Sequence, residues 1–291
     1  MKRIEKTIKS FDGAEIWYEK IGEGKETLYL VDGIATMGFI WRYIIPYFQD
    51  RYQILHMNFR GHGGSPEPED CSTVTIENSV KDLYEVMKDA KVDKAIMIGH
   101  SMGVQTIYEF YRQYPDNVKA LIPICGSYGK LFKSYHGTDK FEPFAKMIIN
   151  FILKPHKPFL KKMQKIVPYN NITYNFVAKG ELNADMIKKE DFMPYLKDIR
   201  DRLSMKAFGY MLESAIKHST LDFLPKIKVP VLIIAGEKDK MTPTFLSIKM
   251  FKIIPNAKLK VLKWGSHTAP IEQPEVTNMY IEEFLIENGF V

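Results

Sequence analysis

A serine flanked by glycines is the first feature of this sequence that could do chemistry. The segment GHSMG, residues 99–103, follows an apolar run typical of a buried strand and precedes a stretch with helical periodicity. Gly99 and Gly103 lack a Cβ atom, so the backbone can turn tightly around Ser101 and push its hydroxyl outward at the end of the strand. A serine that only caps a helix does not need glycine on both sides. The pattern therefore predicts a nucleophilic serine on a strand-to-helix turn.

A serine hydroxyl needs a base within hydrogen-bond reach and a third group that holds the base in the right tautomer. Of the seven histidines, His267 alone follows the last expected strand, in the loop KWGSHTAPIEQP before the last helix. The others lie inside a strand, in the segment RGHGGS, on the turn beside Ser101, or in the central part of the chain. We therefore expect His267 to be the base, and the alternative is an ordinary loop histidine.

The acid that orients the base should lie between Ser101 and His267 in chain order, at the carboxyl end of a strand. Asp239 follows the apolar run VPVLIIAGE and is the candidate, while Glu237, at the end of that run, is its rival. The loop CGSYG after the preceding expected strand has no carboxylate, which removes the other usual position for the acid.

Short apolar runs alternate with longer helical stretches along most of the chain, which indicates parallel strands covered on both faces. The predicted fold class is α/β, a doubly wound and mostly parallel sheet. An N-terminal hairpin is expected over residues 3–22, around Asp12-Gly13, a dipeptide favoured in two-residue hairpin turns. The expected strands cover residues 27–33, 52–60, 94–100, 119–126, 229–237 and 258–264, and the expected helices cover residues 76–90, 102–114 and 274–288.

The alternation breaks over residues 127–221, where the sequence becomes helical, basic and rich in Met and Phe. Prolines in this segment are expected to separate its helices. Because the strand pattern resumes at Val229, we expect these residues to form an inserted helical cap, called the insertion below. It should lie above the carboxyl edge of the sheet, where open α/β sheets bind ligands. Residues 1–126 and 222–291 would then form the core domain.

The motifs GHSMG, RGHGGSP, AGEKDKMTP and GSHTAPIEQPE, in this order and at this spacing, resemble those of the α/β-hydrolase superfamily, in its cap-bearing, esterase-like branch. The resemblance covers nearly all of the core and not the insertion. It implies the α/β-hydrolase fold, with Ser101 as nucleophile, His267 as base and Asp239 as orienting acid. It also implies an oxyanion hole formed by the backbone N–H groups of Ile34 and Met102.

Serine at position 101 argues against the haloalkane dehalogenases and epoxide hydrolases of this superfamily, which use aspartate there. We expect hydrolysis of a carboxylic ester, thioester or lactone through an acyl-enzyme, with no metal or organic cofactor. Three alternatives stay open: perhydrolysis or carbon–carbon bond hydrolysis on the same triad, a ligand receptor without turnover, and a protein whose insertion serves mainly as an interaction surface.

The substrate is expected to be small and to carry an apolar acyl or alcohol group, because the insertion contains two apolar helical faces. The first face would comprise Phe141, Phe144, Met147, Ile148, Phe151 and Ile152, and the second Met205, Phe208, Met211 and Leu212. The candidates for contact with the substrate are Trp41, Phe144, Met147, Phe208 and Met211. The alternative is that these faces only pack against each other and against the core.

Asp32 departs from the resemblance, since superfamily members commonly carry His-Gly where this chain has Asp32-Gly33. A carboxylate near an oxyanion hole would oppose the charge that the hole must stabilise. It would do so unless it is protonated, paired with a cation such as Arg60, or hydrogen-bonded to backbone amides. We expect Asp32 to be a buried structural residue whose hydrogen bonds are supplied by its loop.

Composition limits the other classes of function. The chain has 291 residues, and its two cysteines, Cys71 and Cys125, are far apart, which indicates neither a disulfide framework nor a zinc site. The net charge of +6 is concentrated in residues 130–222, with 17 Lys and Arg against 10 Asp and Glu. That segment should be a solvated basic surface, with weak contact to a membrane surface as the alternative. No nucleic-acid motif or membrane-spanning apolar run occurs, so we expect a cytoplasmic protein, of an oligomeric state that the sequence does not predict.

Overall fold

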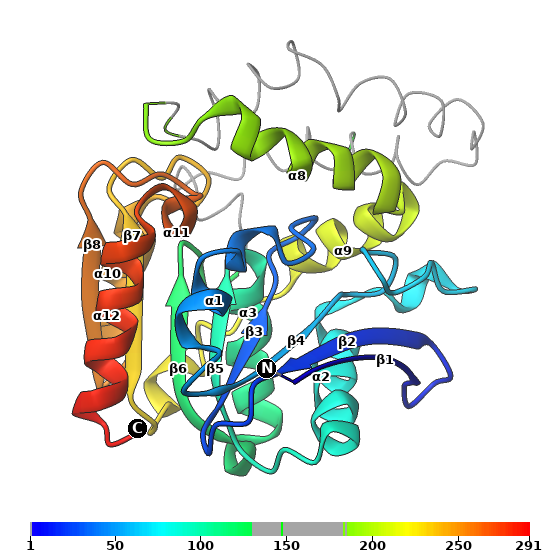
Figure 1. The fold of residues 1–291 in the computed structure, drawn as a ribbon, viewed down its shortest axis with the longest axis horizontal. Helices are drawn as coiled ribbons and strands as arrows, with labels where there is room; N and C mark the ends of the chain where they lie inside the picture. Colours follow the sequence, from blue (N-terminus) through cyan, green and yellow to red (C-terminus); the bar gives the residue numbers. More distant parts are fainter. Residues whose placement is uncertain (1, 130–146, 148–182, 184) are drawn as a thin grey trace.

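A sheet of eight strands runs through the molecule, with helices against both of its faces (Figure 1). The computed structural model describes residues 2–129, 147, 183 and 185–291. The strand order is β1-β2-β4-β3-β5-β6-β7-β8, parallel from β4 onward, with β1 and β2 antiparallel to their neighbours. The strands are β1 (Arg3–Lys9), β2 (Glu15–Ile21), β3 (Thr27–Val31), β4 (Gln53–Met57), β5 (Ala95–His100), β6 (Val118–Ile124), β7 (Val231–Gly236) and β8 (Ala257–Leu262). This confirms the predicted α/β class and every strand expected from the sequence.

The N-terminal hairpin is present, with a longer connection than its sequence suggests. β1 and β2 pair antiparallel from Arg3 opposite Ile21 to Lys9 opposite Glu15. The connection has five residues instead of two, because the N–H of Ser10 donates to the carbonyl oxygen of Ala14 at 2.8 Å and closes the loop there. Gly13 lies inside this loop with φ of +88°, a conformation that glycine adopts without strain.

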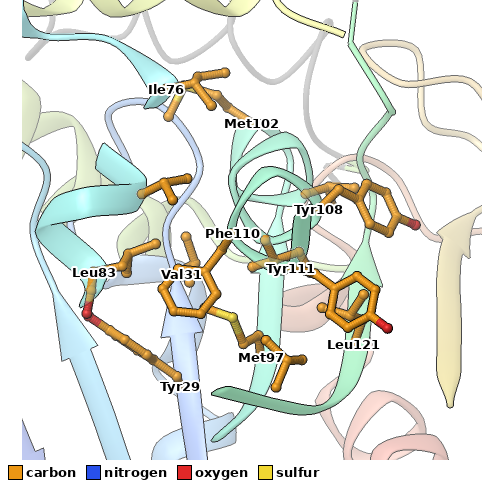
Figure 2. Close-up of a cluster of buried hydrophobic side chains, with 14 of the residues drawn as sticks. Tyr29, Val31, Ile76, Leu83, Met97, Met102, Tyr108, Phe110, Tyr111 and Leu121 are labelled. Atoms are coloured by element: carbon orange, nitrogen blue, oxygen red, sulfur yellow. The ribbon is translucent and has the colours of Figure 1, made fainter. Parts of the chain in front are cut away.

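Alternation of side chains along the strands divides the core into two layers. On β3, Tyr29 and Val31 enter one cluster of buried side chains, while Leu28 and Leu30 enter the other. Because successive residues of a strand point to opposite faces, a strand buried on both faces is expected to be mostly apolar. β3, β5 and β7 are buried along their whole length and are apolar apart from Thr27 and His100 at strand ends. Figure 2 shows the first cluster, where Tyr29, Val31 and Met97 of the sheet meet side chains of two helices.

Helices supply the other wall of each layer. Buried side chains of α2, α3, α9 and α10 belong to the first cluster, and those of α1, α8, α11 and α12 belong to the second. The helices are α1 (Ile44–Phe48), α2 (Ile76–Ala90), α3 (Met102–Gln113), α8 (Lys189–Arg202), α9 (Met205–Lys217), α10 (Thr244–Ile253), α11 (Ala269–Glu272) and α12 (Pro274–Glu287). The three helices expected from the sequence, now α2, α3 and α12, are confirmed. None of the described helices is both long enough and apolar enough to cross a bilayer.

Two helices of the insertion, α8 and α9, are described, and most of its remaining residues lie outside the described part of the chain. Figure 1 shows α8 across the carboxyl edge of the sheet. There Tyr195 of α8 stacks on Phe39 of the loop after β3, with ring centroids 5.0 Å apart. The expectation that every proline separates two helices is wrong for Pro194, which lies inside α8. Proline removes one helical hydrogen bond and crowds the carbonyl group four residues earlier, and a helix held by tertiary contacts can nevertheless continue through it.

Helix α9 packs as part of the main core. Its side chains Ala207, Met211 and Ala215 are buried in the same cluster as α2 and α3. Ser219, just after α9, pairs with Gly129 in an isolated antiparallel bridge. The predicted division into a core of 1–126 and 222–291 and an insertion of 127–221 therefore stays a prediction. By its packing, α9 belongs with the core, although the prediction assigns it to the insertion.

Candidate active site

The side chains of Ser101, His267 and Asp239 meet at the carboxyl edge of the sheet. The Nε2 atom of His267 lies 2.9 Å from the Oγ atom of Ser101. Its Nδ1 atom lies 3.0 Å and 3.2 Å from the two carboxylate oxygens of Asp239. The three residues follow β5, β8 and β7 in turn, so parallel strands bring their loops to one edge. A base between a hydroxyl and a carboxylate is the arrangement that activates a serine nucleophile.

The turn at Ser101 is strained, and glycines make it possible. Ser101 has φ of +55° and ψ of −117°, in a region that side chains other than glycine rarely adopt. A Cβ atom added at Gly103 would lie 2.3 Å from the carbonyl oxygen of Val31, and one added at Gly99 would lie 2.6 Å from that of Gly103. Helix α3 therefore packs directly on the sheet and holds Ser101 at its N-terminus, as the sequence pattern predicts.

Asp239 is a buried acceptor fixed by its own loop. It accepts hydrogen bonds at 2.8 Å from the N–H groups of Met241 and Thr242 and from the Thr242 hydroxyl. Burial raises the pKa of this carboxyl, but the charge and hydrogen bond of His267 and the bonds from Thr242 outweigh it, so the pKa lies below its ordinary value. Its rival Glu237 is exposed and accepts from the N–H of Trp264 at 3.1 Å.

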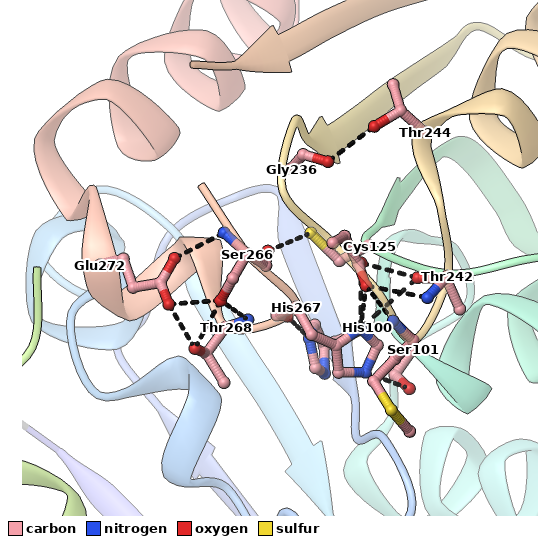
Figure 3. A network of polar contacts seen from close by, with 12 residues as sticks. His100, Ser101, Cys125, Gly236, Thr242, Thr244, Ser266, His267, Thr268 and Glu272 are labelled. Carbon is pink, nitrogen blue, oxygen red and sulfur yellow. Dashed lines mark hydrogen bonds and ion pairs between the residues drawn. The ribbon is translucent and has the colours of Figure 1, made fainter. Parts of the chain in front are cut away.

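Glu272 was not predicted from the sequence, and it holds the loop that carries His267 (Figure 3). One carboxylate oxygen accepts from the N–H of Ser266 at 2.7 Å. The other accepts from the hydroxyl of Thr268 at 2.8 Å and from the N–H of Asn183 at 2.7 Å. The carboxylate thus holds both neighbours of His267 in the chain. The signal was present, because Glu272 follows Thr268 by one helical turn in the segment SHTAPIE.

His100 lies beside the base as a neutral side chain. Its Nε2 atom donates to the carbonyl oxygen of His267 at 2.8 Å, and the two rings lie 5.0 Å apart. Burial, together with the positive charge that His267 can carry, lowers the pKa of His100 to about 3. Since it carries no charge at neutral pH, His100 buttresses the His267 backbone without competing for the proton.

Two backbone N–H groups near Ser101 are available to a ligand. In the described part of the chain, neither Ile34 nor Met102 donates a backbone hydrogen bond. The loop that contains Ile34 lies against Ser101, because a Cβ atom added at Gly33 would be 3.0 Å from the Ser101 Cβ atom. This is the placement that the predicted oxyanion hole requires, and the assignment itself remains a prediction.

Asp32 is buried and fully engaged, as expected of a structural residue. Its side chain is 2% exposed. Its carboxylate accepts from the N–H of Gly38 at 3.1 Å and from the indole N–H of Trp41 at 2.8 Å. The Nε2 atom of His56 lies 3.0 Å from the same carboxylate. The Asp32 carboxylate thus has partners from its own loop and, from β4 and the residues after it, His56 and the Asn58 side-chain amide, which donates at 3.4 Å.

Arg60 is not the cation beside Asp32. The Arg60 guanidinium, 1% exposed, instead binds Asp82 at 2.7 Å and Asp12 at 2.6 Å. It thereby ties the N-terminal hairpin to α2. His56 takes the place beside Asp32, because β4 is the neighbour of β3 in the sheet and pairs His56 with Leu30.

The predicted substrate-contact residues have different positions. Trp41 and Met211 have no exposed surface, so in this conformation they are core packing residues and do not fit the role predicted for them. Phe208 is partly exposed and packs against the small cluster of Ala35, Met37 and Leu203 beside the loop of Ile34. Of Trp41, Met211 and Phe208, only Phe208 has a position compatible with the wall of a substrate site near Ser101.

Two of the predicted contact residues belong to the segment of the insertion that is mostly outside the described residues. Phe144 lies outside them, as do the other members of the first predicted face except Met147. Met147 is 58% exposed. The described residues contain no group of three His, Cys, Asp or Glu side chains that could hold a metal ion.

Similarity to known proteins covers almost the whole chain. A sequence profile of the alpha/beta hydrolase fold matches residues 26–274. An uncharacterized hydrolase, YugF, of Bacillus subtilis is 26% identical over 94% of this chain and 95% of its own length. A 2-hydroxy-6-oxononadienedioate/2-hydroxy-6-oxononatrienedioate hydrolase of Paraburkholderia phymatum is 23% identical over 93% of this chain and 90% of its own. Some mammalian relatives, 24% identical, are longer, and the chain spans 55% to 59% of their length.

Solved structures give the same fold. A thermophilic esterase from Thermogutta terrifontis superimposes with a TM-score of 0.75 over 99% of both chains, at 19% sequence identity. At this identity the likeness extends to the fold, and the reaction has to be argued from the site.

Proposed function

Because the chain belongs to the alpha/beta hydrolase family, we propose that it is a serine hydrolase that cleaves a carboxylic ester, thioester or lactone through an acyl-enzyme. The observation that carries the proposal is the 2.9 Å contact between Ser101 Oγ and His267 Nε2 on a strained turn. Strain of this kind persists where the surroundings hold it in place, and it gathers at functional sites. A protein that only binds a ligand has no chemical need of the third partner, Asp239.

The first half of the reaction forms the acyl-enzyme. Ser101 Oγ attacks the carbonyl carbon while His267 Nε2 takes the hydroxyl proton, and the carbonyl oxygen becomes an oxyanion. Asp239 keeps the proton of His267 on Nδ1, so that Nε2 can accept. The oxyanion would be bound by the N–H groups of Ile34 and Met102, and each such donor contributes about 3 kcal/mol to the transition state. His267 then protonates the leaving group, which departs as an alcohol, thiol or ring-opened hydroxyl.

The second half releases the acid. His267 removes a proton from water, the resulting hydroxide equivalent attacks the acyl carbon, and the tetrahedral intermediate collapses with return of the proton to Ser101 Oγ. Apart from the substrate and one water molecule, these two steps use only groups that the chain itself provides.

The acyl or alcohol group of the substrate should be apolar. The small cluster beside the Ile34 loop contains Ala35, Met37 and Leu203, with Phe208 packed against it. Methionine and phenylalanine side chains adapt to apolar ligands of different shape, and apolar walls stabilise a bound chain in proportion to the area buried.

Covalent labelling tests the proposal directly. Wild-type protein treated with a fluorophosphonate should gain one phosphonyl group on Ser101, located by peptide mass spectrometry. Ser101→Ala should gain none, and Ser72→Ala, which removes an exposed serine whose hydroxyl donates to Asp70, should label like wild type. A panel of chromogenic esters, thioesters and lactones then identifies the class of bond. Lack of labelling and of turnover in the wild type would exclude a serine hydrolase and favour a ligand receptor.

Carbon–carbon bond hydrolysis is the second candidate, supported by the relative from Paraburkholderia phymatum. The substrate in that protein's name is an oxo-dienedioate, which contains no ester bond, so its hydrolysis breaks a bond between carbon atoms. Including such a vinylogous keto acid in the panel separates the two reactions, because an esterase would leave it intact.

A further inference from the structure

Three buried charges lie behind the loop of Ile34, and the mechanism above does not use them. Glu19, Asp32 and His56 are 5%, 2% and 2% exposed. They belong to adjacent strands or their ends, since β2 pairs Glu19 with His56 and β3 ends just before Asp32. Burying a charged group costs free energy unless an opposite charge and hydrogen bonds compensate for the lost hydration. The cluster therefore needs either such pairing or a functional reason to be retained.

His56 must carry a positive charge here. Its Nδ1 atom lies 3.0 Å from Glu19 and its Nε2 atom 3.0 Å from Asp32. Ionised carboxylates only accept hydrogen bonds, so the imidazole has to donate from both nitrogen atoms, which only the protonated ring can do. Burial lowers the pKa of His56, but the two carboxylates more than reverse this and raise it to about 10. Arg3 on β1 lies 2.8 Å from the other oxygen of Glu19.

The carboxylate that His56 neutralises holds the turn of residues 33–38. Both oxygens of Asp32 lie 3.1 Å from the N–H of Gly38, at the far end of that turn. Ala35 and Met37 have φ of +62° and +44°, left-handed conformations that are unfavourable for residues other than glycine. Gly38 also packs on His56 itself, since a Cβ atom added there would lie 3.0 Å from the imidazole Cε1 atom. Such a turn keeps its shape only while its surroundings enforce it.

The same turn contains Ile34, whose N–H is the proposed donor to the carbonyl oxygen of the substrate. Gly33 lies against Ser101, so a change in the turn moves Ile34 relative to the nucleophile. Donors in a reactive site have to be held to within about half an ångström of their working position. A loosened turn would therefore weaken transition-state binding while leaving Ser101, His267 and Asp239 in contact.

We propose that His56 is a positioning residue that, as a buried cation between Glu19 and Asp32, fixes the turn of residues 33–38 and thereby the Ile34 N–H of the oxyanion hole. The catalytic part of this inference rests on the proposed function, while the part about the turn does not. The positive charge of His56 also explains why a carboxylate is tolerated beside an oxyanion hole. The charge of Asp32 is largely neutralised by His56 and therefore opposes the developing oxyanion only weakly.

Hydrogen exchange followed by mass spectrometry tests the role of His56 in the turn. In His56→Gln, amides of residues 33–38 should exchange at least tenfold faster than in wild type, with α3 and β5 unchanged. His218→Gln is the matched control, because His218 is also buried and its Nε2 atom lies 3.0 Å from buried Glu109. That variant should leave exchange at residues 33–38 at the wild-type rate.

Kinetics test the link to the oxyanion hole. On the best ester, kcat of His56→Gln should fall about tenfold or more with KM within twofold, because a ground-state ester uses the hole less than its oxyanion does. Inhibition by a trifluoromethyl ketone, whose adduct with Ser101 is an oxyanion, should weaken in parallel. His218→Gln should lower thermal stability without either change. If His56→Gln does not fold, Trp41→Phe, which removes the indole N–H donated to Asp32 and leaves a smaller buried ring, should give shifts in the same direction.

The outcomes separate the two claims. Unchanged exchange at residues 33–38 in a folded variant would overturn the proposal whether or not the protein is an esterase. Faster exchange with unaltered kcat and inhibitor affinity would overturn the connection to the oxyanion hole. A wild-type protein that neither labels nor turns over esters would remove the proposed function, and the exchange result would still decide what His56 does to the turn.

Discussion

The Nε2 atom of His267 and the hydroxyl oxygen of Ser101 lie 2.9 Å apart, although 166 positions separate the two residues in the chain. The contact exists because β5 and β8 are parallel members of one sheet and end at the same edge. Each residue is held independently of the other. Ser101 is fixed by the packing of α3 on the sheet, and His267 by Glu272, which binds its two neighbours, and by His100, which binds its carbonyl oxygen.

Removing either member of this contact should abolish turnover. We expect Ser101→Ala and, separately, His267→Ala to lose about 10⁴-fold or more in kcat/KM on the best substrate, because the members of such a unit act together. Circular dichroism and thermal unfolding should show an intact fold in both variants. Retention of more than a few per cent of wild-type activity by either one would mean that the reaction uses another nucleophile or base.

The orienting acid is tested by a pair of neighbouring carboxylates. Asp239→Asn should lower kcat roughly 10³-fold, less than Ser101→Ala, because an amide at this position favours the wrong tautomer of His267 while leaving the nucleophile in place. Glu237→Gln is the control and should stay near wild type, since Glu237 is exposed and contacts the Trp264 backbone. A larger loss in Glu237→Gln than in Asp239→Asn would show that the acid has been misassigned.

The triad could be predicted because each member stands in a short local pattern at a strand end. Ser101 lies between two glycines, and Asp239 and His267 each follow an apolar strand within a few residues. Strand and helix positions in the core were predictable for a similar reason, since residues buried on both faces of a sheet leave continuous apolar runs. What these patterns have in common is that their physical cause lies within one segment of the chain.

The charge cluster behind the Ile34 loop could not be predicted, because its cause lies in the strand order. His56 faces Asp32 only because β4 is inserted between β2 and β3 in the sheet. The sequence offers Arg60 as one example of a cation for Asp32, but the turn after β4 carries it toward Asp12 and Asp82 instead. The burial of the predicted contact residues Trp41 and Met211 could not be predicted for a related reason. An apolar side chain is equally suited to a pocket wall and to the core, and only packing decides.

Loss of the Asp32 charge should reduce stability. We expect Asp32→Asn to lower the free energy of unfolding by about 1–2 kcal/mol, because a buried charged acceptor is replaced by a weaker neutral one beside His56. Urea denaturation followed by tryptophan fluorescence measures this. Asp50→Asn, at an exposed surface position, should change it little. The sequence alone predicts little effect of Asp32→Asn on turnover, whereas a turn held by His56 and Asp32 predicts a fall, so the same variant discriminates between these two expectations.

The charge of His56 should make stability depend on pH above neutrality. The pKa of His56 is about 10 in the folded protein, against an ordinary value of 6.5, with Glu19 on β2, Asp32 after β3 and Arg3 on β1 around it. Below pH 6.5 both folded and unfolded chains are protonated, and the full stabilisation is present. Between 6.5 and 10 the folded protein holds a proton that the unfolded chain has lost, so stability falls by up to about 1.4 kcal/mol per pH unit.

This contribution is isolated by comparison with a variant. Free energies of unfolding measured in urea at several pH values from 7 to 9 should decline more steeply for wild type than for His56→Gln, which has no proton to lose there. Tyrosines and lysines titrate alike in both proteins and cancel in the difference. Parallel pH profiles would show that His56 is neutral when folded and that one of its carboxylates is protonated instead.

The length of the acyl chain that the substrate site accepts can be measured with a series of esters from acetate to decanoate. We expect kcat/KM to rise from acetate to an optimum at a longer chain and then to fall. Each methylene buried against apolar side chains such as Phe208 and Met37 adds up to about 0.8 kcal/mol to transition-state binding until the site is full. Phe208→Ala should flatten the rising limb and leave acetate hydrolysis within about threefold of wild type. As a control, Phe245→Ala, at an exposed position on α10, should reproduce the wild-type series. A series that declines steadily from acetate onward would mean that the insertion closes the site to all but the smallest acyl groups, and the apolar substrate class proposed for this protein would have to be given up.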